Sequence, residues 1–354
     1  PPLTALFTVG EEVGMIGVSK MEEGMAQGDI LINMDAEDEG VFYASCAGGV
    51  RNLVSLPVNR EGKTGEVTRR IRVGGLRGGH SGLEIDKGRG NAIHLLGRVL
   101  EALRNRMTFS LHAVSGGEKM NAIAKFASAE ISFEKNGSHT LDTILETMDA
   151  TFKDELESTD PDVFVFGEET SDLPAPMDWA SQGRLISLLR LIPTGVNTMS
   201  FDIEGLVESS TNLGVLTSDE HAVHLESALR SAKKSLKGEI ANRIALTAEA
   251  FEATSTLSAS YPEWPFEKLS PVRDLMQKTY ESMTGASSTV SAIHGGLETG
   301  FLLEKLGRLD TVALGPDIED VHTPQEKLDI ASTGRVYELL KRTLAALDNA
   351  FQAV

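Results

Sequence analysis

Residues 3–14 read LTALFTVGEEVG, and residues 29–40 read DILINMDAEDEG. In both segments a short apolar run, over residues 3–9 and 29–35, leads into acidic side chains. Short runs that are apolar throughout are typical of parallel strands buried on both faces, and the intervening residues 16–25 favour a helix. These segments therefore predict a βαβ unit, which indicates an α/β fold.

The acidic residues Glu11, Glu12 and Asp35 come directly after the two expected strands. Open α/β sheets place ligands at the carboxyl ends of their strands, so we expect these side chains to share one cleft. One carboxylate of the Glu pair can bind a divalent metal while the other takes a proton from water, as metal-assisted hydrolysis requires. The alternative is a solvated acidic surface, which we favour for residues 37–39.

The middle of the chain, residues 50–259, alternates between strands and amphipathic helices, of which the clearest covers residues 91–107. Two prolines and three aromatic residues in 260–266 interrupt this pattern. We therefore predict one α/β domain made of residues 1–49 and 260–354, with a second domain, residues 50–259, inserted between them. Further strands are expected over 108–114, 121–133, 206–216, 289–294 and 311–314, and further helices over 141–156, 179–191, 231–247, 271–283, 297–306 and 333–350.

A pair of strands followed by a helix occurs twice in this middle region, around Phe126 and around Val215. Repetition of one supersecondary pattern is typical of duplicated units. The pattern hints at an internal duplication.

Two histidines have unusual sequence contexts. His322 lies in a polar loop after an apolar strand, where a neutral imidazole can bind zinc, although a lone loop histidine is more often a surface residue. His80 lies in the glycine-rich stretch 77–92, which fits neither the Walker nor the dinucleotide-binding pattern. Ser81 lacks the spacing of a nucleophile elbow, so a serine hydrolase is a poor second interpretation. We assign no function to His94, His112, His139, His221 and His224.

The composition excludes several classes of partner. The chain has 52 acidic and 33 basic side chains and a net charge of −19, which repels nucleic acids and anionic membranes. No apolar run approaches the roughly 20 residues that span a bilayer. The single cysteine, Cys46, cannot form an intramolecular disulfide, so a cytoplasmic location fits best.

Seven segments carry a resemblance to a known family: TVGEEVGMIG (8–17), DILINMDAEDEG (29–40), ASCAGG (44–49), GLRGGHSGLEIDKGRGNA (75–92), GLVESSTNLGVL (205–216), IHGGLETG (293–300) and GPDIEDVHTPQEKLDI (315–330). In this order they resemble the aminoacyl-histidine dipeptidases, or cytosol non-specific dipeptidases, of the di-zinc dipeptidase and carboxypeptidase G superfamily. The resemblance covers essentially the whole chain. It implies an α/β catalytic domain, with a mixed sheet flanked by helices, and an inserted α+β lid domain that mediates dimerisation.

The resemblance also implies residue roles. Glu11 looks like the general base, while Glu12, Asp35 and His322 look like ligands of a site for two divalent ions, zinc in the first place and cobalt or manganese as alternatives. His80 resembles a lid histidine that stabilises the oxyanion of the tetrahedral intermediate, in several relatives in the partner subunit's active site. The positions that would hold the substrate are Asn121 and Arg230, and those that would line the same pocket are Gly295, Gly296 and Glu298.

The activity implied is hydrolysis of dipeptides with a free amino terminus, of the Xaa-His type and broader, by a homodimer that pairs through its lid. Two alternatives stay open. The first is an N-acyl amino acid amidohydrolase of the same superfamily, and the second is a non-catalytic, dimeric binding module.

One departure from the family pattern affects the metal site. The family also uses a His-x-Asp pair and a bridging Asp in an Asp-Asn-Gly context, both upstream of the Glu pair, whereas residues 1–10 contain neither His nor Asp. We therefore expect an N-terminally truncated family member. Residues 1–354 alone are expected to bind one ion weakly and to have little activity.

Overall fold

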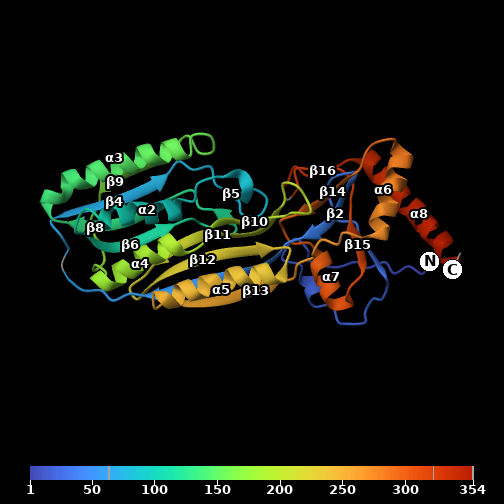
Figure 1. Cartoon of the computed structure of the whole chain (residues 1–354), viewed down its shortest axis with the longest axis horizontal. Helices are drawn as coiled ribbons and strands as arrows, with labels where there is room; N and C mark the ends of the chain where they lie inside the picture. The colour runs from blue at the N-terminus through green and yellow to red at the C-terminus, as the bar shows by residue number, and fades with distance from the viewer. Residues whose placement is uncertain (63, 322, 353–354) are drawn as a thin grey trace.

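The structure, a computed structural model, describes residues 1–62, 64–321 and 323–352. Figure 1 shows an elongated molecule with two lobes, and both ends of the chain lie in the smaller lobe. The larger lobe is formed by the middle of the chain and is therefore inserted into the smaller one. Within the described residues, the structure contains no helix that is both long and apolar enough to span a bilayer.

The smaller lobe is built on a four-stranded mixed sheet with the strand order β1-β15-β2-β14. β1 runs parallel to β15 and β14 parallel to β2, whereas β15 and β2 are antiparallel. The sheet thus combines strands from both ends of the chain. The strands are β1 (Ile30–Asn33), β2 (Val41–Cys46), β14 (Thr289–Ile293) and β15 (Asp310–Ala313).

Helices cover both faces of this sheet, because successive side chains of a strand point to opposite faces. Ile30 and Ile32 of β1 pack into a core with α6 and α8, while Leu31 packs into a separate core with α1 and α7. This three-layer arrangement is the one expected of an α/β domain. The helices are α1 (Ile16–Ser19), α6 (Pro271–Thr284), α7 (Glu298–Leu306) and α8 (Ile330–Gln352), and a short hairpin is formed by β16 (Ile318–Glu319) and β17 (Lys327–Leu328).

The strand predicted for residues 3–9 is wrong. This segment is not part of a strand, and Phe7 and Val9 are 90% and 73% exposed. An apolar run becomes a strand only when a neighbouring strand pairs with its backbone, and among the described strands none pairs with this segment. The predicted helix 16–25 is shortened to α1, and the predicted βαβ unit does not form, because β1 pairs with β15 instead.

The larger lobe contains one nine-stranded antiparallel sheet. Its order is β13-β3-β12-β11-β6-β8-β4-β9, and β10 pairs with β11 off this path. The strands are β3 (Gly48–Pro57), β4 (Val67–Gly74), β6 (Ser110–Gly116), β8 (Ala127–Phe133), β9 (Phe164–Glu169), β10 (Gly195–Met199), β11 (Val207–Ser218), β12 (Ala222–Ser231) and β13 (Thr254–Tyr261).

Four helices form a single layer over one face of this sheet and share one hydrophobic core with it. Asn91 caps the first of them by accepting hydrogen bonds from the backbone N–H groups of Ile93 and His94, and Asp178 caps the third through the N–H of Ser181. An antiparallel sheet covered on one face is the arrangement of an α+β domain. The helices are α2 (Ala92–Arg104), α3 (Ser138–Glu155), α4 (Trp179–Leu191) and α5 (Lys234–Ala250).

The predicted fold class is confirmed: a mixed sheet flanked by helices carries an inserted α+β domain. The helices predicted in the middle and at the end of the chain correspond to α2 through α8. The strand predicted over 121–133 is divided into a two-residue strand and β8. Among the described strands longer than two residues, seven were not predicted, namely β2, β3, β4, β9, β10, β12 and β13.

Candidate functional site

The glycine-rich segment places His80 beside Asn121. Strand β5 (Gly79–His80) pairs antiparallel with β7 (Ala122–Ile123), with His80 opposite Ala122. The backbone oxygen of Asn121 accepts a hydrogen bond of 2.9 Å from the N–H of Ser81. His80 and Asn121, which are distant in the sequence and which the family resemblance selects, are therefore neighbours at the end of one small sheet.

The imidazole of His80 is half-buried and held in one orientation. Its Nδ1 accepts a hydrogen bond of 3.2 Å from the N–H of Leu83, so in the neutral ring the proton lies on Nε2. Burial lowers the pKa of His80, the charge of Arg230 lowers it further, and Glu84 opposes both effects. His80 is therefore neutral near pH 7 and can donate a hydrogen bond from Nε2.

Arg230, at the end of β12, presents an unused hydrogen-bond donor. Its Nη1 donates to the hydroxyl of Tyr261 at 2.7 Å, while its Nε is buried and has no acceptor among the described residues. Burial raises the pKa of the Tyr261 phenol, so Tyr261 stays neutral. A buried N–H without an acceptor is costly, and a planar guanidinium matches the geometry of a carboxylate. Arg230 is therefore suited to bind an anionic group.

His294 joins the two lobes at this point. It follows β14 in the smaller lobe, and its Nε2 lies 2.7 Å from the hydroxyl of Ser210 on β11 of the larger lobe. The imidazole is 6% exposed. Burial, assisted by the charge of Arg230, lowers the pKa of His294 to about 3. His294 is therefore neutral throughout the physiological pH range.

The segment before Glu11 packs against the loop that follows His294. Thr8 donates a hydrogen bond of 2.7 Å to Oε2 of Glu298, whose Oε1 is buried without a partner among the described residues. A Cβ on Gly296 would lie 2.8 Å from the ring of Tyr261 and 3.1 Å from the Met15 side chain. The turn that carries Glu11 therefore adjoins the residues that surround Arg230.

Glu11 and Glu12 lie in a tight turn. The backbone oxygen of Glu11 accepts hydrogen bonds from the N–H groups of Gly14 and Met15, at 2.9 and 2.8 Å. The flanking residues Gly10 and Gly14 have φ angles of 67° and 104°, a region that favours glycine. The two glycines thus allow the backbone to turn sharply at the acidic pair.

Asp35 lies beyond the end of β1, next to the end of β15. The N–H of Ala36 donates to the backbone oxygen of Leu314, and Gly315 approaches Ala36 too closely for a Cβ. Among the described residues, the structure brings together no group of three or more His, Cys, Asp or Glu side chains that could hold a metal ion. His322 lies outside the described residues.

Comparison with known proteins identifies the family. A family model described as the peptidase dimerisation domain matches residues 71–160. The cytosol non-specific dipeptidase of Escherichia coli (strain K12) is 33% identical over 344 residues, which are 97% of this chain and 71% of that protein. The chain belongs to the cytosol non-specific dipeptidase family. The aminoacylhistidine dipeptidase of Vibrio alginolyticus has the same fold, with a TM-score of 0.91 and 33% identity over 96% of this chain and 69% of its own.

Membership of the dipeptidase family makes the chain a hydrolase, and a divalent metal is general in the family. The family predicted from the sequence motifs is thus confirmed. The peptidase dimerisation domain includes both His80 and Asn121. Ser210, Tyr261 and His294 were not singled out from the sequence, although Ser210 and His294 lie within two of the segments that carry the resemblance.

Proposed function

We propose that residues 1–354, once completed by the further metal ligands that they lack, hydrolyse dipeptides with an unblocked amino terminus, including dipeptides that end in histidine. The similar proteins are named as a cytosol non-specific dipeptidase and an aminoacylhistidine dipeptidase, which supports this substrate class. The observation that carries the proposal is the buried, unpartnered Nε of Arg230 beside a neutral His80. A dipeptide offers a carboxylate that Arg230 can bind and a scissile carbonyl that His80 can contact.

Arg230 and Asn121 hold the substrate in this proposal. The free carboxylate of the dipeptide accepts two hydrogen bonds from Arg230, one of them from the buried Nε. Asn121 is exposed and directly precedes β7, the strand that pairs with His80, so its amide can bind the substrate backbone. Together they place the scissile bond at a fixed position relative to His80.

Two groups act on the scissile bond. Glu11 accepts the proton of the attacking water and transfers it to the leaving amine. The Nε2–H of His80 donates to the oxygen that becomes negatively charged, and because His80 is already neutral this donor is available at pH 7.

The metal ligands in this proposal are Glu12, Asp35 and His322. Two carboxylates and an imidazole suit zinc, with cobalt or manganese as alternatives, and two ions would need further ligands. When bound, a divalent ion supplies Lewis acidity and lowers the pKa of water. Among the described residues, no three such side chains lie close enough together to hold a metal ion. The roles given above for Arg230, Asn121, Glu11 and His80 therefore involve no bound ion.

We also propose how this activity is organised. The four-stranded sheet belongs to a catalytic domain, residues 1–49 and 260–354, and residues 50–259 form a lid. The match to a peptidase dimerisation domain supports a homodimer that pairs through the lid. The name of the Escherichia coli relative supports a cytoplasmic location.

A dipeptidase assay of two proteins tests the proposal. The first is residues 1–354 alone, and the second, the extended enzyme, is the same chain preceded by a segment that supplies a His-x-Asp pair and a bridging Asp. We expect zinc-dependent hydrolysis of unblocked dipeptides by the extended enzyme and little by residues 1–354. Preference for N-acetylated amino acids would favour an amidohydrolase, and robust turnover by residues 1–354 would mean that the ligands are misassigned.

Arg230→Lys is expected to raise the KM of the extended enzyme for dipeptides about 10- to 100-fold with a smaller change in kcat. Lysine keeps the charge but loses the planar pair of donors, and a hydrogen bond to a charged group contributes roughly 1.5–3 kcal/mol. Steady-state kinetics measures the effect. Dipeptide amides, which lack the carboxylate, should bind the parent and the variant equally weakly.

The matched control is Arg243→Lys, on the exposed side of α5. It should leave both constants unchanged. An equal rise in KM for amides and free acids would contradict the assignment of Arg230 to the carboxylate.

A further inference from the structure

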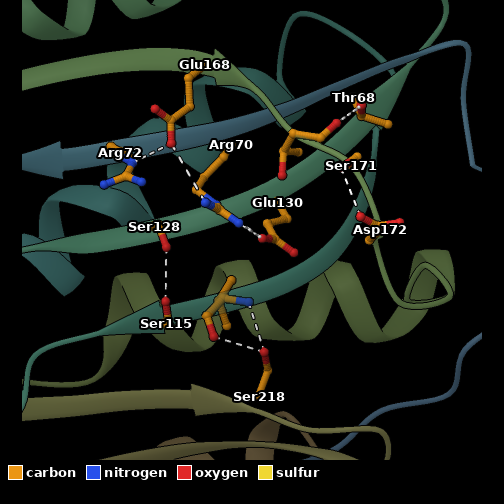
Figure 2. Close-up of polar contacts among 12 residues, drawn as sticks. Thr68, Arg70, Arg72, Ser115, Ser128, Glu130, Glu168, Ser171, Asp172 and Ser218 are labelled. Atoms are coloured by element: carbon orange, nitrogen blue, oxygen red, sulfur yellow. Dashed lines mark hydrogen bonds and ion pairs between the residues drawn. The ribbon is translucent and has the colours of Figure 1, made fainter.

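The sheet of the larger lobe carries polar side chains on the face that its helices leave open. On β4, β8 and β9 these side chains pair with one another at the surface. Arg70 contacts Glu130 at 2.6 Å, and Arg72 contacts Glu168 at 2.6 Å (Figure 2). The four side chains are between 19% and 46% exposed, and ion pairs of this kind contribute little to stability. This part of the face is therefore an ordinary solvated surface.

The same face is different on β11, where the polar side chains are buried. Ser210 and Asn212 alternate with the core residue Leu213, so they point away from the helices. Arg230 lies opposite Ser210 in the ladder with β12 and points the same way. Ser210 and Asn212 are each 1% exposed. Because a buried polar group is costly unless it is hydrogen-bonded, the contacts of these two residues indicate what they hold in place.

The contacts of Asn212 enclose Asn121. Its Nδ2 lies 2.8 Å from the backbone oxygen of Met120 and 2.8 Å from that of Ala122, the two neighbours of Asn121 in the sequence. The backbone oxygen of Asn121 itself accepts the N–H of Ser81. All three backbone oxygens of residues 120–122 are thus engaged, two by Asn212 and one by the segment that carries His80.

The backbone of β11 lies directly against this segment. An added Cβ on Gly214 would lie 2.6 Å from both Cα and the backbone oxygen of Met120, which is closer than van der Waals contact allows. A short side chain such as that of Asn212 can span the remaining distance only because the two backbones are so close. Strand β11 therefore forms the support on which residues 119–122 rest.

The small sheet that carries His80 depends on such a support. Among the described residues, β5 and β7 form a sheet of two strands, and two paired strands are marginally stable by themselves. The position of His80 is therefore determined by what β7 and the residues before it pack against. On the other side, an added Cβ on Gly82 would lie 2.7 Å from the backbone oxygen of His294, which leaves the sheet little room to move.

We propose that Asn212 is a positioning residue for the hydrolysis. Its amide fixes the backbone on both sides of Asn121 and, through the pairing of β7 with β5, the place of His80. An amide nitrogen has two hydrogens, and the backbone oxygens of Met120 and Ala122 account for both. Asn212 therefore acts through Asn121 and His80 and not on the substrate. The catalytic parts given to those two residues rest on the proposed function.

Hydrogen exchange of residues 1–354, measured by mass spectrometry, tests the positioning without an activity measurement. Asn212→Ala should speed exchange in residues 79–84 and 119–124 about 10-fold or more, because two hydrogen bonds that oppose local opening are lost. If the alanine variant does not fold, Asn212→Ser makes a milder change at the same place and should speed exchange in the same two segments.

Asn52→Ala is the matched control for these measurements. Asn52 of β3 is also 1% exposed, its Nδ2 donates to the hydroxyl of Ser255 at 2.7 Å, and its Oδ1, like that of Asn212, has no partner among the described residues. It has no contact with β5 or β7 in this hydrogen bond. Asn52→Ala should therefore leave exchange in residues 79–84 and 119–124 at the parent rate.

Kinetics of the extended enzyme separate positioning from a general loss of stability. Asn212→Ala should lower kcat about 10- to 100-fold, because a displaced oxyanion donor stabilises the transition state less. In a His80→Ala enzyme the same substitution should lower kcat by less than about 3-fold, because residues that act as one unit are not additive. Asn52→Ala should lower kcat equally little in both enzymes.

Two results would overturn the inference. One is exchange at the parent rate in residues 79–84 and 119–124 of the folded Asn212 variant. The other is an equal loss of kcat from Asn212→Ala with and without His80. If the extended enzyme turned over no dipeptide at all, the proposed function would fail, and the exchange result would still decide whether Asn212 positions the segment of His80.

Discussion

Glu11→Gln is expected to lower kcat for dipeptide hydrolysis by the extended enzyme about 10³-fold, with little change in KM. A positioned general base contributes roughly 10²- to 10⁴-fold to the rate, and glutamine has the shape of glutamate without its basicity. The turn at residues 11–15 should persist, because the backbone oxygen of Glu11 accepts the two hydrogen bonds that close it. Single-turnover and steady-state rates with an unblocked dipeptide measure the effect.

Two further variants separate proton transfer from metal binding. Glu12→Gln should weaken zinc binding in a calorimetric titration, whereas Glu11→Gln should not. Glu22→Gln changes an exposed residue after α1 and should leave both properties unaltered. A Glu11→Gln enzyme that keeps more than a tenth of the parent kcat would contradict the role of Glu11 as the base.

Lys237→Ala is expected to lower the free energy of unfolding of residues 1–354 by about 3–5 kcal/mol, the usual cost of leaving one charge of a buried pair uncompensated. Nζ of Lys237 lies 2.6 Å from Oε2 of Glu263, and their side chains are 10% and 12% exposed. Nζ also donates to the backbone oxygen of Tyr261 at 3.0 Å. The pair thus joins α5 of the larger lobe to the segment that leads back to the smaller lobe. Denaturant unfolding measures the change.

The double variant Lys237→Met/Glu263→Leu should recover most of the lost stability, because no buried charge then remains unpaired. The exposed pair of Lys153 and Asp149 on α3 provides the control, and Lys153→Ala should cost about 0.5 kcal/mol or less. A loss below about 1 kcal/mol for Lys237→Ala would show that water solvates Glu263 in the folded protein.

The helices were predicted better than the strands, for a physical reason. An amphipathic helix such as α2 carries its 3.6-residue period and its capping residue, Asn91, within a single segment. Strand β13 reads TSTLSASY, which has few large apolar residues. It is stabilised by pairing with β3, and the hydroxyl of Thr256 donates a hydrogen bond to the backbone oxygen of Leu53, 203 residues away. Residues 3–9 give the opposite error, because their apolar pattern is typical of a strand but no described strand pairs with them.

The sequence by itself determined the family, and it supplied the prediction of which chemical groups form the candidate site. The acidic pair Glu11–Glu12 and the glycine-rich motif around His80 are local patterns, and the family that such motifs predicted is confirmed. Such patterns record which residue types occur together along the chain. They do not record which segments pack together.

Only the tertiary structure decided how these groups are arranged. It joined His294 to Ser210, 84 residues apart, and it placed Tyr261 against Arg230. It also paired β6 with β11 at the centre of the larger lobe's sheet, a contact that no single segment of the sequence predicts. These contacts depend on strand register and helix packing between distant segments, and their free energy comes from burial that no single segment achieves alone.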